Sequence, residues 1–258
     1  MIKDQVKQNW WQRFHQKFIV EERYVDPVVR RNLYILSAAL FVFGLLTFTI
    51  ILIQVLSNTG IVVLDHHVEN WFDHIRSPDA TSTMIALAIA FGPIALPIII
   101  LVVTVSWIIF SKHAWRPLLL AAFMLVGLII VQITAHLVQR HRPPLNLMLF
   151  GADHTFSFPS GHVFGTSDFL LITTYLLVSR RPTKARVIIG LFIVSIGIAI
   201  QICSRLYLGY HWLSDTLASA CFSLALLGIV IALDTWRTVR VDGEAIEGQL
   251  SSRQTEGT

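Results

Sequence analysis

The sequence predicts an all-α integral membrane protein: a helical bundle with six transmembrane helices and an outer amphipathic helix. Hydrophobic residues make up 54% of the 258 residues and charged residues only 14%, against roughly 25% charged residues in an average soluble domain. The mean hydropathy is +0.65, which excludes a disordered chain. Six apolar stretches each approach the roughly 20 residues that a helix needs to cross a bilayer.

The spans follow one another with short connections. The first covers residues 33–56. The second, about 84–110, contains Gly92, Pro93 and Pro97, so we expect a kinked or broken helix whose freed carbonyls are satisfied by neighbouring helices. The others are predicted at about 118–138, 163–178, 187–203 and 212–233. This pattern divides the chain into an N-terminal arm (1–32), a six-span domain (33–233) and a polar tail (234–258).

The basic residues predict the orientation of the bundle. Sixteen of the 20 Lys and Arg residues lie in the arm, in the tail and in the connections after the second and fourth spans. Short basic loops stay in the cytoplasm, so we expect the protein to lie in the cell membrane with both termini in the cytoplasm. Because these basic residues report orientation, we expect no nucleic-acid partner. The remaining arginines are Arg76, Arg140, Arg142 and Arg205. Because the last three belong to neighbouring outer segments, we expect them to bind an anion.

The first outer loop predicts an amphipathic helix over 61–76, lying at the membrane interface. Its apolar stripe consists of Val68, Trp71, Phe72 and Ile75. A second stripe carries Asp65, Glu69 and Asp73 at four-residue steps. The spacing of His66, His67 and His74 matches no compact set of metal ligands, so a solvated helix face is the favoured interpretation.

Three polar clusters fall on the outer side by the count of spans. The first is Arg140-His141-Arg142-Pro143, after the third span. The second is Pro159-Ser160-Gly161-His162, before the fourth. The third joins Ser204-Arg205 to His211 and Asp215, between the fifth and sixth spans. One such cluster would mean little, but three on one side predict a common site.

The third cluster predicts a nucleophile. His211 and Asp215 are four residues apart at the start of a helix, so their side chains share one face. A carboxylate that accepts a hydrogen bond from one imidazole nitrogen leaves the other nitrogen basic and exposed. We therefore expect Asp215 to orient His211.

The residues of the other clusters, together with Arg205, predict a phosphate-binding site. Ser160 as N-cap and Gly161 open the start of a helix, where free N–H groups and the helix dipole hold an anion. His162 could protonate a departing oxygen as general acid. Arg142 and Arg205 could bind the non-bridging oxygens. Nothing in this arrangement requires a metal or another cofactor.

These motifs resemble the type 2 phosphatidic acid phosphatase superfamily, whose pattern is KxxxxxxRP, then PSGH, then SRxxxxxHxxxD. The second and third motifs are complete, and the resemblance covers roughly residues 33–233. The first motif has Arg142-Pro143, but Ala135 occupies the position of its lysine. Arg140 is expected to supply that charge, because it is permanently charged; His136 is the alternative.

The resemblance implies a phosphohistidine mechanism. His211 would attack phosphorus, Asp215 would orient it and His162 would protonate the leaving group. The phosphate would be held by Arg142, Ser160, Gly161, Arg205 and Arg140. The expected enzyme removes the terminal phosphate of a lipid phosphate or diphosphate at the outer leaflet, without a metal.

The substrate and some other functions stay open. Undecaprenyl pyrophosphate, a carrier for cell wall biogenesis, is favoured, with phosphatidylglycerol phosphate or phosphatidic acid as alternatives. A lipid-phosphate binding protein without turnover is the non-enzymatic alternative, although such a protein would not need both His211 and Asp215. Vanadium haloperoxidases share these residues but are soluble. The oligomeric state is not predicted.

Asp168 lies six residues into the fourth span, where an ionisable residue is costly. Six residues correspond to about 240° of rotation away from His162. We therefore expect Asp168 to pair with a polar neighbour such as Gln132 or Gln201 rather than to take part in catalysis.

Overall fold

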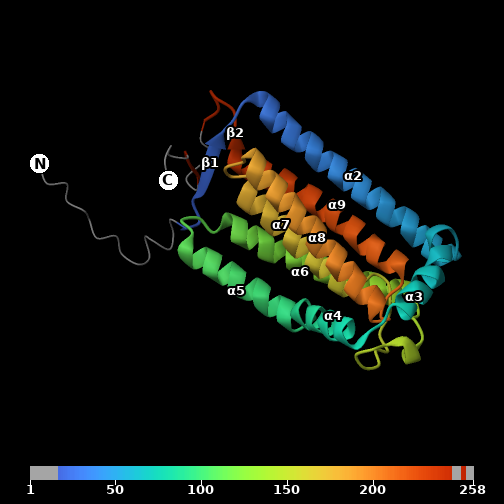
Figure 1. The fold of residues 1–258 in the computed structure, drawn as a ribbon. Helices are drawn as coiled ribbons and strands as arrows, with labels where there is room; N and C mark the ends of the chain where they lie inside the picture. Colours follow the sequence, from blue (N-terminus) through green and yellow to red (C-terminus); the bar gives the residue numbers. More distant parts are fainter. Residues whose placement is uncertain (1–16, 246–250, 254–258) are drawn as a thin grey trace, which may run out of the picture.

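The computed structural model describes residues 17–245 and 251–253. Long apolar helices lie side by side, with a small sheet at one end of the bundle and the helix α3 at the other (Figure 1). The helices are α2 (Pro27–Ser57), α3 (Asp65–His74), α4 (Pro78–Ala90), α5 (Ala95–Phe110), α6 (Trp115–Val138), α7 (Gly161–Val178), α8 (Lys184–Tyr207) and α9 (Leu213–Thr238), with short 3-10 turns η1 (Gly60–Leu64) and η2 (Leu145–Leu147).

The helical spans confirm the predicted membrane bundle. Five described helices are long and apolar enough to cross a membrane: α2, α6, α7, α8 and α9. The predicted break in the second span is confirmed, because α4 and α5 are bent by 50° and make a sixth span if counted together. Large apolar side chains such as Phe110 and Ile94 are exposed, as expected where lipid is the solvent.

Several predicted span boundaries differ from the observed ones, and two of them show the reason. Helix α2 starts at Pro27 rather than at residue 33, because Asp26 caps it by accepting a hydrogen bond from the Val28 N–H (2.7 Å) and proline is favourable in the first turn. Helix α9 continues to Thr238, five residues beyond the predicted end at 233. Both extensions contain polar residues, so a prediction based on apolar runs did not include them.

Helices α2 and α9 pack backbone against backbone. A β-carbon on Gly44 would lie 2.5 Å from the Ala225 nitrogen, and one on Gly228 would lie 2.6 Å from the Ser37 carbonyl oxygen. The Ser37 hydroxyl donates to the carbonyl oxygen of Gly228 (2.8 Å). Small residues allow such close approach in membranes, where packing and hydrogen bonds hold helices together.

A three-stranded sheet that the all-α prediction did not include closes one end of the bundle. The strand β1 (Val20–Tyr24) is central and pairs in parallel with β2 (Val239–Arg240) and β3 (Ser251–Arg253). These pairings join residues more than 200 positions apart, so no local periodicity reveals them. The residues 1–16, 246–250 and 254–258 of the predicted arm and tail lie outside the described residues.

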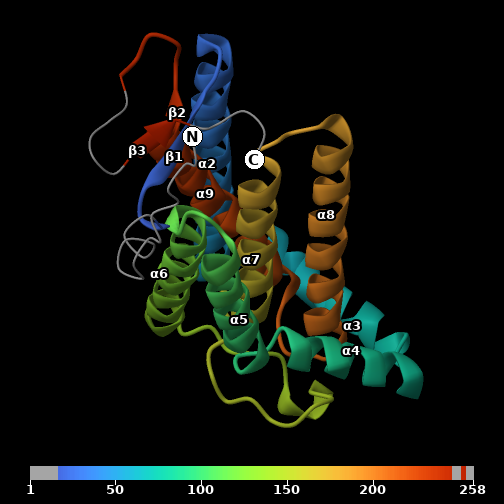
Figure 2. The ribbon, with the colours of Figure 1, turned by 90° about the vertical axis from the view of Figure 1, so that its left-hand side faces the viewer.

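The outer segment 61–76 is helical as predicted, but it is divided into η1 and α3. Figure 2 shows α3 at the end of the bundle opposite the sheet. Phe72 packs inward, whereas Trp71 is exposed. Asp65, on the acidic stripe of this segment, is only 2% exposed. Burial of this carboxylate has consequences for the site described next.

Candidate active site

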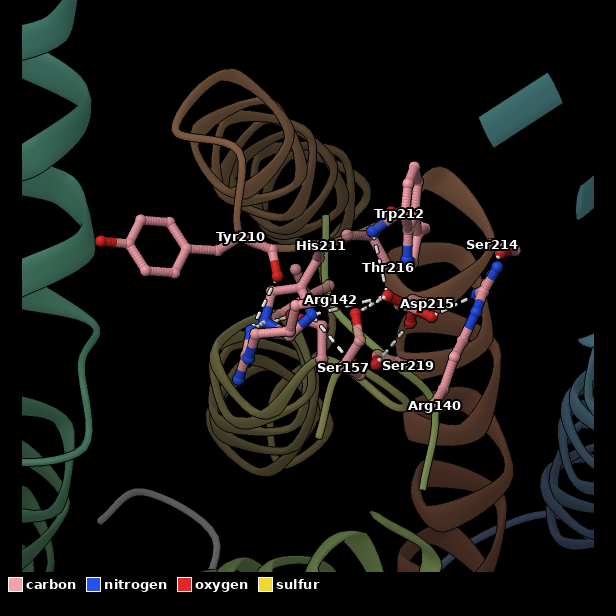
Figure 3. A network of polar contacts seen from close by, with 12 residues as sticks. Arg140, Arg142, Ser157, Tyr210, His211, Trp212, Ser214, Asp215, Thr216 and Ser219 are labelled. Atoms are coloured by element: carbon pink, nitrogen blue, oxygen red, sulfur yellow. Dashed lines mark hydrogen bonds and ion pairs between the residues drawn. The ribbon is translucent and has the colours of Figure 1, made fainter. Parts of the chain in front are cut away.

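Residues of the first and third predicted polar clusters meet in one network of polar contacts (Figure 3). The connection from α6 to α7 carries Arg142, and the connection from α8 to α9 carries His211. Their side chains meet: Arg142 Nη1 lies 3.1 Å from His211 Nε2. The structure therefore brings the predicted nucleophile and a predicted phosphate-binding arginine into direct contact.

The hydrogen bonds of His211 leave Nε2 as its basic nitrogen. His211 Nδ1 lies 2.8 Å from the carbonyl oxygen of Ser157, so Nδ1 must carry the proton and donate it. The nearest Asp215 oxygen is farther from Nδ1, at 3.7 Å. The tautomer predicted for His211 is thus set first by the Ser157 carbonyl, with Asp215 as a nearby negative charge.

The electrostatic surroundings keep His211 neutral. Burial lowers the pKa of His211 to about 4, and Arg142 and Arg205 also lower it, whereas the hydrogen-bonding interaction with Asp215 raises it. At neutral pH the imidazole is therefore unprotonated on Nε2, the form that a nucleophile requires.

Asp215 is fully buried and held by three donors. Its Oδ2 accepts from the Ser157 hydroxyl and from the Trp212 N–H (2.9 Å), and its Oδ1 accepts from Arg140 Nη1 (2.5 Å). Ser157 thus contacts both members of the pair, through its carbonyl to His211 and through its hydroxyl to Asp215. The carboxylate is fixed in one orientation behind the imidazole.

Arg140 differs from the expectation that it contacts phosphate. Its Nη2 pairs with Asp65 Oδ2 (2.6 Å), and its Nη1 donates to both Asp215 and the Ser214 hydroxyl (2.7 Å). Asp65 in turn accepts from the Ser214 N–H and hydroxyl. Figure 3 places Arg140 on the side of Asp215 away from Arg142. Its charge is occupied by two carboxylates, so this geometry favours a positioning role.

Arg142 is held by the loop that precedes Ser157. Its guanidinium donates to the carbonyl oxygens of Tyr210 (2.7 Å) and Thr155 (3.1 Å) and pairs with Asp153 Oδ2 at 3.0 Å. These bonds fix the Arg142 guanidinium beside His211 Nε2. Its positive charge is balanced by one paired carboxylate, that of Asp153.

Arg205 has a buried guanidinium without an acceptor. The residue is 3% exposed, and its guanidinium carbon lies 4.4 Å from the centre of the Tyr210 ring. Among the described residues no side-chain hydrogen bond or salt bridge of Arg205 is formed, and its Nε is fully buried. A buried arginine without an anion is costly, so this position is suited to an oxyanion from a ligand.

The start of α7 lies beside the same residues. Ser160 is the N-cap as predicted, with its hydroxyl 3.5 Å from the Val163 nitrogen. A β-carbon on Gly161 would meet nothing within 4 Å, so this helix N-terminus is open. His162 is half-buried and interacts electrostatically with Arg205 and His211. A helix N-terminus with free N–H groups beside arginines can hold a phosphate.

The break between α4 and α5 lies against His162. A β-carbon on Gly92 would be 3.5 Å from His162 Nε2. The Gly-Pro pair that interrupts the second span therefore also leaves room for the predicted general acid. The sequence indicated the break but gave no sign of this contact.

Asp168 is not paired as expected. It is fully buried, and neither carboxylate oxygen has a hydrogen-bond partner among the described residues, so the expected pairing with Gln132 or Gln201 was wrong. Asp168 Oδ2 would lie 2.9 Å from a β-carbon on Gly127 of α6. It faces a helix interface and takes no part in the polar network around His211.

Sequence reasoning missed Ser157, Ser214 and Asp65 as residues of the site. Ser157 and Ser214 stand close in sequence to motif residues, so a search for polar neighbours of the motifs could have found them. Asp65 contacts Arg140, which is 75 positions away, and no local pattern indicates such a pair. No group of three or more His, Cys, Asp or Glu side chains within the described ranges is arranged to hold a metal.

Comparison with known proteins finds a matching family domain and similar proteins. Residues 116–238, which contain the three polar clusters, match the PAP2 superfamily. Over 198 residues the chain is 24% identical to phosphatidylglycerophosphatase B of Bacillus subtilis (strain 168). This alignment covers 74% of this chain and 93% of that protein. The fold is similar to the crystal structure of a transmembrane PAP2-type phosphatidylglycerolphosphate phosphatase from Bacillus subtilis, with a TM-score of 0.65, 23% identity, and coverage of 77% of this chain and 95% of the other. Residues 116–238 therefore carry a PAP2 superfamily domain, and the membrane bundle that contains it is similar in sequence and fold to transmembrane PAP2-type phosphatases.

Proposed function

We propose that the protein removes the terminal phosphate from a membrane lipid through a phosphohistidine intermediate on His211. The observation that carries this proposal is the contact of a neutral, oriented Nε2 with Arg142, near the buried Arg205, whose guanidinium has no acceptor among the described residues. A phosphate in this space would take the place of the Arg142 contact on Nε2 and provide the missing acceptor for Arg205.

The proposed reaction has two steps. His211 Nε2 attacks phosphorus, the bond from phosphorus to the lipid oxygen breaks, and His162 gives that oxygen a proton. A water then attacks the phosphohistidine, His162 accepts the proton from that water, and the P–N bond breaks to release phosphate. Arg142, Arg205 and the N–H groups at the start of α7 would stabilise the charge that develops on the transferring group.

The substrate class follows from the position of the site at one end of a membrane bundle. A phosphate headgroup can reach His211 there while its chains remain in lipid. The relative named phosphatidylglycerophosphatase B makes phosphatidylglycerol phosphate the first substrate to test, and undecaprenyl pyrophosphate, favoured from sequence, is the second. We also propose that this end faces the outside of the cell, because the basic connections lie at the other end.

The decisive experiment measures phosphate release by the full-length protein in detergent with excess chelator. The panel contains phosphatidylglycerol phosphate, phosphatidic acid and undecaprenyl pyrophosphate. We expect release from at least one lipid and loss of that activity in His211→Ala. His67→Ala is the matched control, because His67 is an exposed histidine on α3. A lack of release from every lipid would refute the enzymatic proposal, and full activity of His211→Ala would refute the nucleophile.

A further inference from the structure

A second group of cations lines a cavity at the end of the bundle opposite His211. The cavity has a volume of about 160 Å³ and lies between β1, the end of α5, the start of α6 and the end of α7. Its charged lining consists of Glu21, Arg23, His113, Arg116 and Arg180. Trp107 and Trp115 also line it, and such aromatic residues are typical of the headgroup level of a bilayer.

Arg23 is the arginine of this cavity that lacks a carboxylate among the described residues. Its Nη1 donates to the carbonyl oxygen of Ser179 at the end of α7. Its Nε and Nη2 are buried and have no hydrogen-bond partner. These two N–H groups form one edge of the guanidinium, the edge that binds two oxygens of a carboxylate or phosphate side by side.

The other cations of the cavity already have partners. Arg116 forms a two-bonded pair with Asp234 (3.2 and 2.8 Å). Arg180 pairs with Glu21, whose carboxylate also lies 3.7 Å from His113 Nε2. The unmet positive charge is therefore concentrated on Arg23. Burial and the neighbouring Arg116 lower the pKa of Arg23, and a bound anion would oppose both effects.

We propose that this cavity binds a phosphate group through the free edge of Arg23. The volume is many times the roughly 15 Å³ that one water needs, so a tetrahedral phosphate fits together with ordered water. Two sources share this chemistry: inorganic phosphate, and the headgroup of an anionic phospholipid in the adjacent leaflet. Bound phosphate would connect β1 to the end of α7 and stabilise the end of the bundle that carries the sheet.

The test separates this cavity from the active site by using full-length protein that carries Arg142→Ala and Arg205→Ala. The unfolding temperature in detergent is measured against inorganic phosphate, with sodium chloride at matched ionic strength as the reference. We expect a saturable rise in the unfolding temperature. Adding Arg23→Gln should raise the phosphate concentration at half-effect by about tenfold or more, since charged hydrogen bonds are lost.

Two further variants keep the test decisive. Arg23→Lys retains the charge but removes the two-donor edge, so it should also weaken phosphate binding, and it serves if Arg23→Gln does not fold. Arg181→Gln is the matched control, because Arg181 is an exposed neighbour of Arg180 outside the cavity lining. It should leave the half-effect concentration within about twofold. No stabilisation by phosphate, or equal loss in the Arg181 and Arg23 variants, would overturn the proposal.

A second experiment, in lipid nanodiscs, identifies the source of the phosphate. The same proteins are placed in phosphatidylcholine nanodiscs with or without phosphatidylglycerol. Stabilisation by phosphatidylglycerol that depends on Arg23 assigns a lipid headgroup, whereas stabilisation by inorganic phosphate alone assigns the free ion. Because the background lacks two arginines of the proposed active site, failure of the phosphatase proposal leaves this result unaffected.

Discussion

The side chain of Arg140 connects two elements of the candidate site. The guanidinium joins Asp65 of α3 to Asp215 of α9, and Ser214 contacts both Arg140 and Asp65. Both carboxylates are buried, so the arginine neutralises charges that would otherwise be costly. In the family pattern a lysine occupies the position of Ala135, and the contacts of Arg140 favour a positioning role over replacement of that lysine.

We predict that Arg140→Gln and Asp65→Asn each lower kcat by about tenfold, which corresponds to about 1.4 kcal/mol in the barrier, with little change in KM. The reason is that Asp215 loses its outer support and His211 is oriented less well. Steady-state kinetics on the best lipid substrate provide the measurement. Arg76→Gln is the control, because Arg76 bonds carbonyls at the same end without touching Asp215. A raised KM with unchanged kcat in Arg140→Gln would instead assign Arg140 to phosphate binding.

The pH dependence of kcat/KM should report the neutral state of His211. Because its pKa is lowered to about 4, Nε2 is lost as a nucleophile only when the pH falls through that value. The second ionisation of a phosphate monoester near pH 6 also affects the dependence of kcat/KM on pH. The useful quantity is therefore the shift of the acid limb between the parent protein and a variant. Asp215 raises the pKa of His211, so Asp215→Asn should move the acid limb to lower pH while reducing kcat.

The control for this profile is His67→Ala, which should match the parent protein at every pH. An acid limb that stays unchanged in Asp215→Asn would contradict the assignment of that limb to His211.

At the scale of elements, the break between α4 and α5 serves both the membrane span and the site. A β-carbon on Gly92 would lie 2.7 Å from the Ala88 carbonyl oxygen, so Gly92→Ala must displace the break, and it would bring a methyl group against His162. We predict that kcat falls by roughly tenfold or more, and that the unfolding temperature also falls because the clash is with a backbone oxygen.

Gly165→Ala is the matched control for the break. Its added carbon would meet only the movable end of the Leu96 side chain, at 2.8 Å, so kcat should stay near the parent value. Equal kcat values for Gly92→Ala and Gly165→Ala would show that the break does not position His162.

The elements that the sequence could predict are those with local signals. Apolar runs located all six spans, the proline and glycine residues located the break, and the Pro-Ser-Gly-His motif located the cap of α7. Contacts between distant residues had no such signal: the contact of Asp65 with Arg140 joins α3 to the connection between α6 and α7. The sheet at the opposite end was missed for the same reason, since β1 pairs with strands near the other end of the chain.

At the scale of the whole molecule, the two ends of the bundle carry different charge arrangements. At the end near α3, arginines surround His211 and the open start of α7. At the other end, Asp234 of α9 accepts from Arg116, Trp115 and Tyr175 and so connects three helices. The basic connections of the chain lie at this second end, which is the distribution expected of a cytoplasmic face.

This polarity leads to a prediction about orientation in the cell membrane. A single cysteine at His154, exposed in the connection from α6 to α7, should react with a membrane-impermeant maleimide in intact cells. A cysteine at Lys184, exposed at the start of α8, should react only after the membrane is permeabilised. Both variants are made after replacing Cys203 and Cys221 by Ala. Labelling of the Lys184 position with protection of the His154 position would place the active site in the cytoplasm. The enzyme would then act on the inner leaflet, and the inference from basic connections would be wrong.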